Sequence, residues 1–240
     1  MKYLKSYNES RDSIESICNQ YAIRNYTIND DGSIDVDGDV LLCNKSLKKL
    51  PIRFNYVSGS FNCIDNKLVT LEGSPREVGE GFYCQSNELT SLKYCPENVG
   101  NFSCYNNKLS SLKWSPKQVR GSYVCHSNKL TSLQFSPREV GGCFNCKNNQ
   151  LQTLEFGPER VGGYFECCNN NITTLKYLPK ELGKLYCHNN PLPNQILDNI
   201  SDIDIICQEA EDFSIWRKDG TLDERRFKYM LEILKEEGKI

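Results

Sequence analysis

Apolar and polar positions alternate through the middle of the chain in a pattern that repeats with a fixed period. Seven times, a large apolar residue, Cys, Asn and then Leu or Ile follow one another with one, two and one variable residues between them. A period of this length kept over many copies predicts a solenoid, in which stacked coils share one core. The cysteines, 20 or 21 residues apart, are Cys63, Cys84, Cys104, Cys125, Cys146, Cys167 and Cys187.

Two more columns accompany the cysteines. The alternation around each Cys predicts a short β-strand on which the large residue and the Cys point inward. The large residues are Phe61, Phe82, Phe102, Tyr123, Phe144, Phe165 and Leu185. The Asn column is Asn66, Asn87, Asn107, Asn128, Asn149, Asn170 and Asn190. An earlier, degenerate copy carries Val40, Leu42 and Leu47 without an Asn.

The second half of each repeat has its own apolar positions. A second Leu is followed by Pro and then by Val, as in Leu92, Pro96 and Val99. Pro fixes φ and lacks an N–H, so it suits an extended or tightly turned segment. We therefore expect a return segment that is extended or forms a short 3₁₀ turn. The predicted fold class is a repeat solenoid with a parallel β-sheet.

The two ends of the chain depart from the repeat. Residues 10–23 have apolar side chains at helical spacing, and alternation around Asp31 and Gly32 predicts a β-hairpin. We expect residues 1–39 to form an N-terminal cap, 40–192 the solenoid and 193–240 a helical C-terminal cap. Thr221 to Glu224 has the form of a capping box. The helix after it would bury one face with Leu222, Phe227, Met230, Leu231 and Leu234.

Two stretches resemble a known family. Residues 99–109 and 182–192 match the leucine-rich repeat pattern L-x-x-L-x-L-x-x-N-x-L, with Cys in the third apolar place. The short repeats are similar to those of bacterial effectors and of repeat proteins encoded by bacteriophages. The resemblance covers about residues 40–192. It implies a curved right-handed coil with the sheet on its concave face, and an Asn column that hydrogen-bonds backbone groups of neighbouring coils.

Charge and hydropathy narrow the classes of partner. The formal net charge is −2, and acidic and basic residues are mixed throughout. No basic stripe is present of the kind that displaces counterions from nucleic acid. No segment has the run of apolar residues that a membrane span or a signal peptide needs. We expect no nucleic-acid or membrane binding and a cytoplasmic location, which is the host bacterial cytoplasm if a phage encodes the protein.

The thirteen cysteines invite a chemical interpretation. Seven occupy a column that requires a small apolar side chain, and free Cys is often buried, so core packing is favoured. The alternative is a metal or thiol-redox protein that uses Cys143, Cys146, Cys167 and Cys168. No sequence motif of a hydrolase, nucleotide-binding enzyme or zinc protease occurs. We expect no enzymatic activity, cofactor or metal site.

The repeat instead offers two continuous surfaces for a protein partner. On the concave face, Tyr and His combine large contact area with hydrogen-bonding tips. The candidate residues on this favoured face are Tyr83, Tyr105, His126, Lys147, Tyr164, Glu166, Tyr186 and His188. The expected mechanism is occlusion of a partner protein, in a phage setting a host or defence protein. Self-association and a small-molecule ligand stay open.

An aromatic column on the return side is the alternative surface. It contains Tyr94, Trp114, Phe135, Phe156 and Tyr177. If the small residues that follow it face inward, the aromatics are partly exposed and form a contact patch. If the segment alternates simply, the aromatics belong to the core. We favour partial burial.

Overall fold

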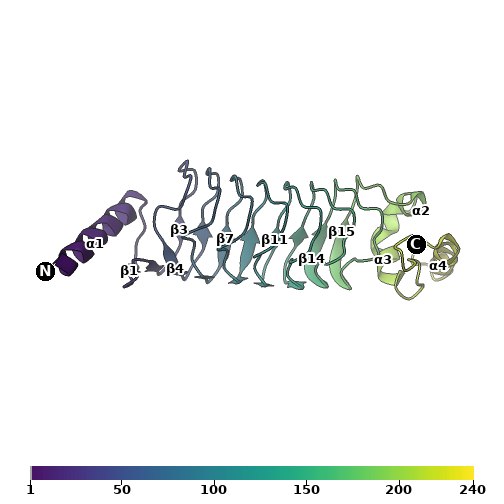
Figure 1. The fold of residues 1–240 in the computed structure, drawn as a ribbon. Helices are drawn as coiled ribbons and strands as arrows, with labels where there is room; N and C mark the ends of the chain where they lie inside the picture. The colour runs from purple at the N-terminus through teal and green to yellow at the C-terminus, as the bar shows by residue number, and fades with distance from the viewer. Residues whose placement is uncertain (1) are drawn as a thin grey trace.

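The computed structural model describes residues 2–240, with side chains from Arg11 onward. Parallel coils of about 21 residues stack along one axis into an elongated body, with helices at both ends (Figure 1). The predicted repeat solenoid is confirmed at this level. Each coil contributes two short strands, which build two neighbouring columns along the body.

The first column contains the strands that carry the Cys positions. It consists of β3 (Val40–Leu41), β5 (Phe61–Asn62), β7 (Gly81–Tyr83), β9 (Asn101–Ser103), β11 (Tyr123–Val124), β13 (Phe144–Asn145) and the last residues of β14 (Arg160–Glu166) and β15 (Glu181–Tyr186). Neighbours pair in parallel and in register, so that Phe61 lies beside Phe82 and Phe82 beside Phe102. We call the outward side of this column the sheet face.

The second column replaces part of the expected return segment. It consists of β4 (Phe54–Val57), β6 (Glu77–Val78), β8 (Asn98–Val99), β10 (Gln118–Val119), β12 (Glu139–Val140) and the first residues of β14 and β15. In residues 40–192, all of which the structure describes, no 3₁₀ helix occurs, so that part of the prediction is wrong. From Val99 onward the Val after each Pro pairs with its counterpart in the next coil, as Val99 does with Val119, whereas β6 pairs with β4 and not with β8. The return is therefore a tight turn followed by a strand.

The core lies between the two columns and is continuous from end to end. Phe61, Phe82, Phe102, Phe144 and Phe165 are fully buried, and adjacent rings stack, with 5.5 Å between the centroids of Phe61 and Phe82. All seven column cysteines are buried and unpaired. Stacked coils thus bury their apolar side chains against one another, because no single coil could cover them alone.

The Asn column links the backbones of successive coils. The Nδ2 of Asn107 donates to the carbonyls of Cys84 and Cys104, at 3.1 and 3.0 Å. Its Oδ1 accepts from the N–H of Leu89 in the preceding coil. The side chain is almost fully buried, so these bonds satisfy backbone groups that water does not reach.

A close approach between coils explains the glycines after the Val column. A Cβ added to Gly141 would lie 1.9 Å from the carbonyl oxygen of Arg120, and one added to Gly162 would lie 2.2 Å from that of Gly141. Arg120 occupies the same column as these glycines. The preceding coil is one residue shorter here, with two residues between Val99 and Phe102 against three between Val119 and Tyr123.

The N-terminal elements lead into the stack. Helix α1 (Lys2–Gln20) precedes β1 (Tyr26–Ile28) and β2 (Ile34–Val36), which pair antiparallel as the alternation predicts. Strand β2 then pairs in parallel with β4, which places the hairpin at the end of the second column. Cys18 of α1 is fully buried in the common core.

The C-terminal elements are helical. They are α2 (Asn194–Leu197), η1 (Ile200–Asp202), α3 (Ile203–Glu209) and α4 (Glu224–Glu236). Asp223, rather than the expected Thr221, caps α4 by accepting from the N–H of Arg226. The apolar face of α4 buries Phe227, Met230 and Leu234. Among the described residues, no helix combines the length and apolar character needed to cross a membrane.

Candidate functional site

The sheet face carries the predicted Tyr and His residues in two neighbouring columns preceded by Tyr164, and several of them contact each other. The rings of Tyr105 and His126 stack with centroids 4.4 Å apart. Tyr164 and Tyr186 meet edge to face at 5.8 Å, and Lys184 lies over the Tyr186 ring. These aromatic side chains therefore already share contact area within the chain.

A polar cluster lies next to these rings on the same face. Glu166 accepts from Asn145 through one carboxylate oxygen, at 2.6 Å, and from Lys147 through the other, at 3.1 Å. Partial burial and the nearby Lys147 ammonium lower the pKa of His126, because both disfavour its charged form. The cluster is an internally satisfied network, which leaves few free polar groups for a ligand.

Other positions of the sheet face are less exposed than strand alternation predicts. Gln85, Ser103, Asn145 and Cys168 are buried between their column neighbours. The Sγ of Cys168 lies 3.1 Å from Nδ1 of His188, a contact that the sequence analysis did not anticipate. Tyr83 is half-buried, and Tyr186 and His188 are exposed at the C-terminal end of the face.

The aromatic column of the return side is half exposed. Its exposed fractions are 46% for Tyr94, 49% for Trp114, 50% for Phe135, 59% for Phe156 and 36% for Tyr177. The interpretation of these residues as core is therefore wrong, and partial burial is observed. We call these five residues the return stripe. Lysines partly cover it, with the ammonium of Lys113 4.5 Å from the Trp114 ring centroid.

The backbone of the return stripe is unusual. Tyr94, Trp114, Phe135 and Phe156 have φ between 66 and 74°. Each is the third residue of a four-residue β-turn, in which the N–H of the fourth residue donates to the carbonyl of the first. In the turn at Trp114, the N–H of Ser115 donates to the carbonyl of Leu112 at 2.9 Å. Type II turns require positive φ at this place and normally put Gly or Asn there. Bulky side chains in this conformation are rare because Cβ crowds the carbonyl.

The chain fills its other left-handed positions differently. In each coil, the residue before the Asn column also has positive φ, and there it is Asp, Asn or Ser: Asp65, Ser86, Asn106, Ser127, Asn148, Asn169 and Asn189. Gly73 has φ of 93° at the position where the return stripe begins. Within the described residues, the aromatic side chains with positive φ are those of four return-stripe residues, Tyr94, Trp114, Phe135 and Phe156.

Hydroxyl groups hold these turns in place. The Ser111 Oγ accepts from the N–H of Lys113 at 3.1 Å, and the Ser132 Oγ accepts from that of Gln134 at 3.0 Å. The Ser136 Oγ donates to the carbonyl of Phe156 in the next coil, at 2.9 Å. A Ser or Thr stands directly before the second Leu in each repeat, at Thr70, Ser91, Ser111, Ser132, Thr153 and Thr174. The sequence analysis missed this turn signal.

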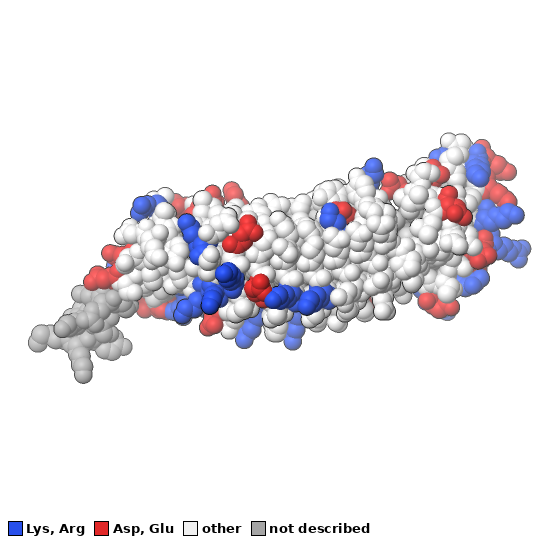
Figure 2. All heavy atoms as spheres, turned by 90° about the horizontal axis from the view of Figure 1, so that it is seen from above, with Lys and Arg blue, Asp and Glu red and all other residues white. Residues whose placement is uncertain are grey.

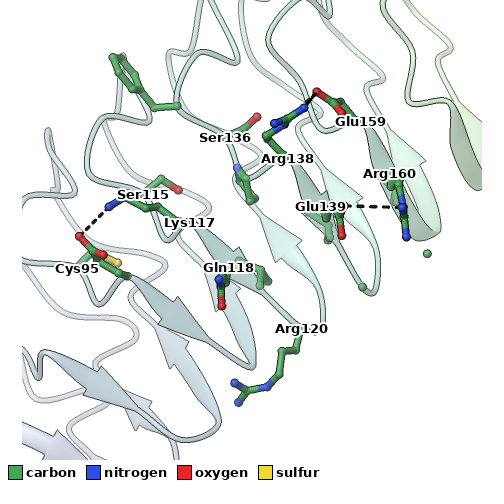
Figure 3. A pocket seen from close by; sticks show the side chains of 18 of the residues that line it. Cys95, Ser115, Lys117, Gln118, Arg120, Ser136, Arg138, Glu139, Glu159 and Arg160 are labelled. Carbon is green, nitrogen blue, oxygen red and sulfur yellow. Dashed lines mark hydrogen bonds and ion pairs between the residues drawn. The ribbon is translucent and has the colours of Figure 1, made fainter.

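A groove with a volume of about 1450 Å³ lies beside the return stripe. We call it the return groove, and Figure 3 shows its side chains rising from successive strands of the second column. A smaller hollow of about 770 Å³ continues it toward the C-terminal helices, with Phe156 and Tyr177 in its lining. The larger groove is lined by Tyr94, Trp114, Phe135, Ser115, Ser136, Lys117, Gln118, Arg120, Arg138, Glu139, Glu159 and Arg160, among others.

Charged side chains in the return groove pair with one another. Lys117 lies 3.0 Å from Glu97 and Arg138 lies 2.6 Å from Glu159. Arg160 lies 3.8 Å from Glu139 (Figure 3) and 3.5 Å from Glu181. On the face seen from above in Figure 2, acidic side chains interrupt a row of basic ones, so neither sign forms a continuous stripe there. The exposed pairs contribute little stability, but they leave the groove without a strong net field.

The four cysteines of the metal or thiol alternative do not share a surface. Cys146 and Cys167 are buried in the core column, Cys168 is buried on the sheet face, and Cys143 is half-buried. Burial raises the pKa of the Cys146 and Cys167 thiols well above its usual value, which disfavours the reactive thiolate. Among the described residues, no three His, Cys, Asp or Glu side chains are placed to hold one metal ion.

Comparisons with protein-family models, with curated proteins and with solved structures find no match for this chain.

Proposed function

We propose that this protein is a non-enzymatic binding module of the leucine-rich repeat type, which holds a protein partner in the return groove. The observation that carries the proposal is the row of aromatic side chains on left-handed backbone. Each such residue costs about 1–2 kcal/mol relative to an unstrained position. Apart from Ala22, the chain places Asn, Asp, Ser or Gly at its other left-handed positions.

Burial in the core does not compensate for this backbone strain. The four rings are about half exposed, so they bury less apolar surface than the fully buried Phe column. Strained residues persist where surrounding structure holds them, and they cluster at binding sites. A contiguous exposed aromatic patch beside a groove is also a common form of protein interface. Binding a partner would give the exposed rings the burial that the fold alone does not.

The sheet face is the second candidate surface. The exposed Tyr186 and His188 favour it, together with Tyr164, at the C-terminal end of that face. The internal pairing of Tyr105, His126 and Glu166 counts against the rest of it. The likeness to phage repeat proteins adds the proposal that the partner is a host protein whose own site is occluded.

Paired surface variants test this function. Trp114→Asn with Phe135→Asn removes two rings and leaves residues that accept the left-handed backbone. Tyr164→Ser with Tyr186→Ser is the matched change on the sheet face. Both variants and the unchanged protein would be used to capture partners from bacterial lysate, with equal folding checked by circular dichroism.

We expect the groove variant to lose a partner that the sheet-face variant keeps. Loss in the sheet-face variant alone would move the site to that face. Equal recovery of every partner by all three proteins would contradict binding through either surface.

A further inference from the structure

We infer that the return groove takes a proline-rich segment in the polyproline II conformation, laid along the axis of the solenoid. This inference rests on the proposed function and adds the class of partner. Three properties of the groove carry it: the spacing of the return stripe, the balance of its charges and the hydrogen-bond donors in its lining.

The spacing of the rings comes from the stacking of the coils. Strands in neighbouring coils lie about 4.8 Å apart, so alternate rings such as Tyr94 and Phe135 recur about every 9.6 Å along the axis. A polyproline II helix has three residues per turn and a rise of about 3.1 Å per residue, so residues that face the same side recur about every 9.3 Å. The two repeats stay within about 0.6 Å of each other over four coils.

Other peptide conformations fit this spacing less well. One side of an α-helix faces the same way once per turn, about every 5.4 Å. This pitch exceeds the spacing between coils by about 0.6 Å per coil, so the mismatch reaches about 2.4 Å over four coils. Residues on one side of an extended strand recur about every 6.7 Å, which matches neither one coil nor two. Aromatic-lined grooves that bind proline-rich segments use the stiffness of polyproline II to lower the entropy cost of binding.

The charges of the return groove favour an uncharged occupant. Lys117 pairs with Glu97, Arg138 with Glu159, and Arg160 with Glu139 and Glu181. Lys113 lies over the Trp114 ring and Arg120 on a backbone carbonyl, so five basic and four acidic side chains leave the lining with a formal net charge of only +1. A strongly charged ligand would gain little from such a lining. Proline residues carry no charge, so a proline-rich segment leaves these pairs intact.

The donors in the lining match the backbone of such a segment. Proline has no N–H, so a proline-rich chain presents carbonyl acceptors and almost no donors. The groove lining includes the indole N–H of Trp114, the amide of Gln118 and the guanidinium of Arg120. Arg120 donates from one nitrogen to the carbonyl of Gly79, two coils earlier, which holds its side chain along the stack. Its other N–H groups are donors for a bound carbonyl.

A fluorescence titration tests the inference on the full chain. The chain has two Trp residues, so Trp216→Phe leaves Trp114 as the reporter. The probe is a synthetic peptide of ten prolines with blocked ends, and a Gly-Ser peptide of equal length is its control. A β-linked glucan hexasaccharide is included because sugar rings also stack on exposed aromatics.

We expect saturable binding of the proline peptide with a blue shift of Trp114 emission. The Gly-Ser peptide should bind at least tenfold more weakly. Phe135→Asn should weaken proline binding at least tenfold, whereas Tyr186→Ser on the sheet face should leave it unchanged.

Two results would overturn the inference: equal affinity for both peptides, or proline binding that Phe135→Asn does not weaken. Binding of the glucan without the proline peptide would also overturn it and would assign the groove to a polysaccharide. If the proline peptide fails while the groove variant still loses a captured protein partner, the proposed function stands and only the partner class is wrong.

Discussion

At the scale of single residues, the return stripe sets backbone strain against surface exposure. Trp114 has φ of 66° and is about half exposed. Neither local propensity nor burial in the isolated chain accounts for a bulky ring in this conformation. The hydroxyls of Ser111 and Ser136, and the turn bond to Leu112, show how neighbouring groups stabilise this type of turn.

The strain at Trp114 predicts an unusual order of stability. Trp114→Ala keeps a Cβ in the left-handed region, whereas Trp114→Gly removes it. Glycine loses about 0.4–1 kcal/mol through the entropy of the unfolded chain, which is less than the strain it relieves. We expect the Gly variant to equal or exceed the Ala variant in free energy of unfolding, measured by urea denaturation.

Lys113 supplies the control for this comparison. It precedes Trp114 and does not have positive φ. There the order should reverse, with Ala more stable than Gly. If the Ala variant is more stable than the Gly variant at both positions, the turn at Trp114 is not strained.

Tyr123 offers a second test at this scale. It is the one Tyr in a column of Phe and Leu, and its buried hydroxyl lies 2.6 Å from the Ser115 Oγ. Either Ser115→Ala or Tyr123→Phe leaves a buried hydroxyl without its partner, at a cost of about 1–3 kcal/mol. The double variant removes both hydroxyls, so we expect it to recover part of that loss. Strictly additive effects in a urea double-mutant cycle would contradict the coupling.

At the scale of the elements, each coil depends on how closely the next one approaches. The two strands β8 and β9 are separated by Gly100 alone, and the second column exists because the chain turns sharply there. This column also forms the floor of the return groove. Stability of the corner and shape of the groove therefore depend on the same contacts.

Gly141→Ala should disrupt this approach. The added Cβ would lie 1.9 Å from the carbonyl oxygen of Arg120, a backbone atom that moves only with its coil. We expect a loss of more than about 2 kcal/mol in the free energy of unfolding, typical of overpacked positions. Arg120→Ala is the control in the same column, since a Cβ is already present there, and it should cost much less. A difference below experimental error between the two variants would contradict the steric argument.

At the scale of the whole molecule, the period of the sequence predicts the stacking but not the conformation of the turns. Columns such as Phe102, Cys104 and Asn107 follow from spacing alone, because one stack of parallel strands can satisfy all of them. The left-handed turn at Trp114 does not follow, because aromatic residues normally avoid it. The sequence signals for this turn are Gly73, which stands at the equivalent position one coil before Tyr94, and the Ser and Thr column. Burial of Gln85 and Cys168 on the sheet face depends on neighbouring side chains, which a period does not describe.

The stacked design makes the two sides of each coil the main source of its stability, so the last coil should open more easily than a central one. Cys104 has a repeat coil on each side, whereas Cys187 lies in the last coil, beside α3. Burial raises the pKa of the Cys187 thiol to about 12, so in the closed state it reacts slowly with alkylating reagents at pH 8. We expect pulse alkylation with mass spectrometry to label Cys187 before Cys104 at low denaturant concentration.

We expect a contact with α3 to control this opening. The carboxylate of Asp204 accepts from the N–H of Leu185, at 2.9 Å, and so joins α3 to the last strand. Asp204→Asn keeps the size of the side chain and weakens that bond, because a neutral oxygen replaces a charged one. It should speed labelling of Cys187 and leave that of Cys104 unchanged. Equal acceleration at both thiols would mean that the stack opens as one unit, since only global unfolding exposes a central coil and the last coil together.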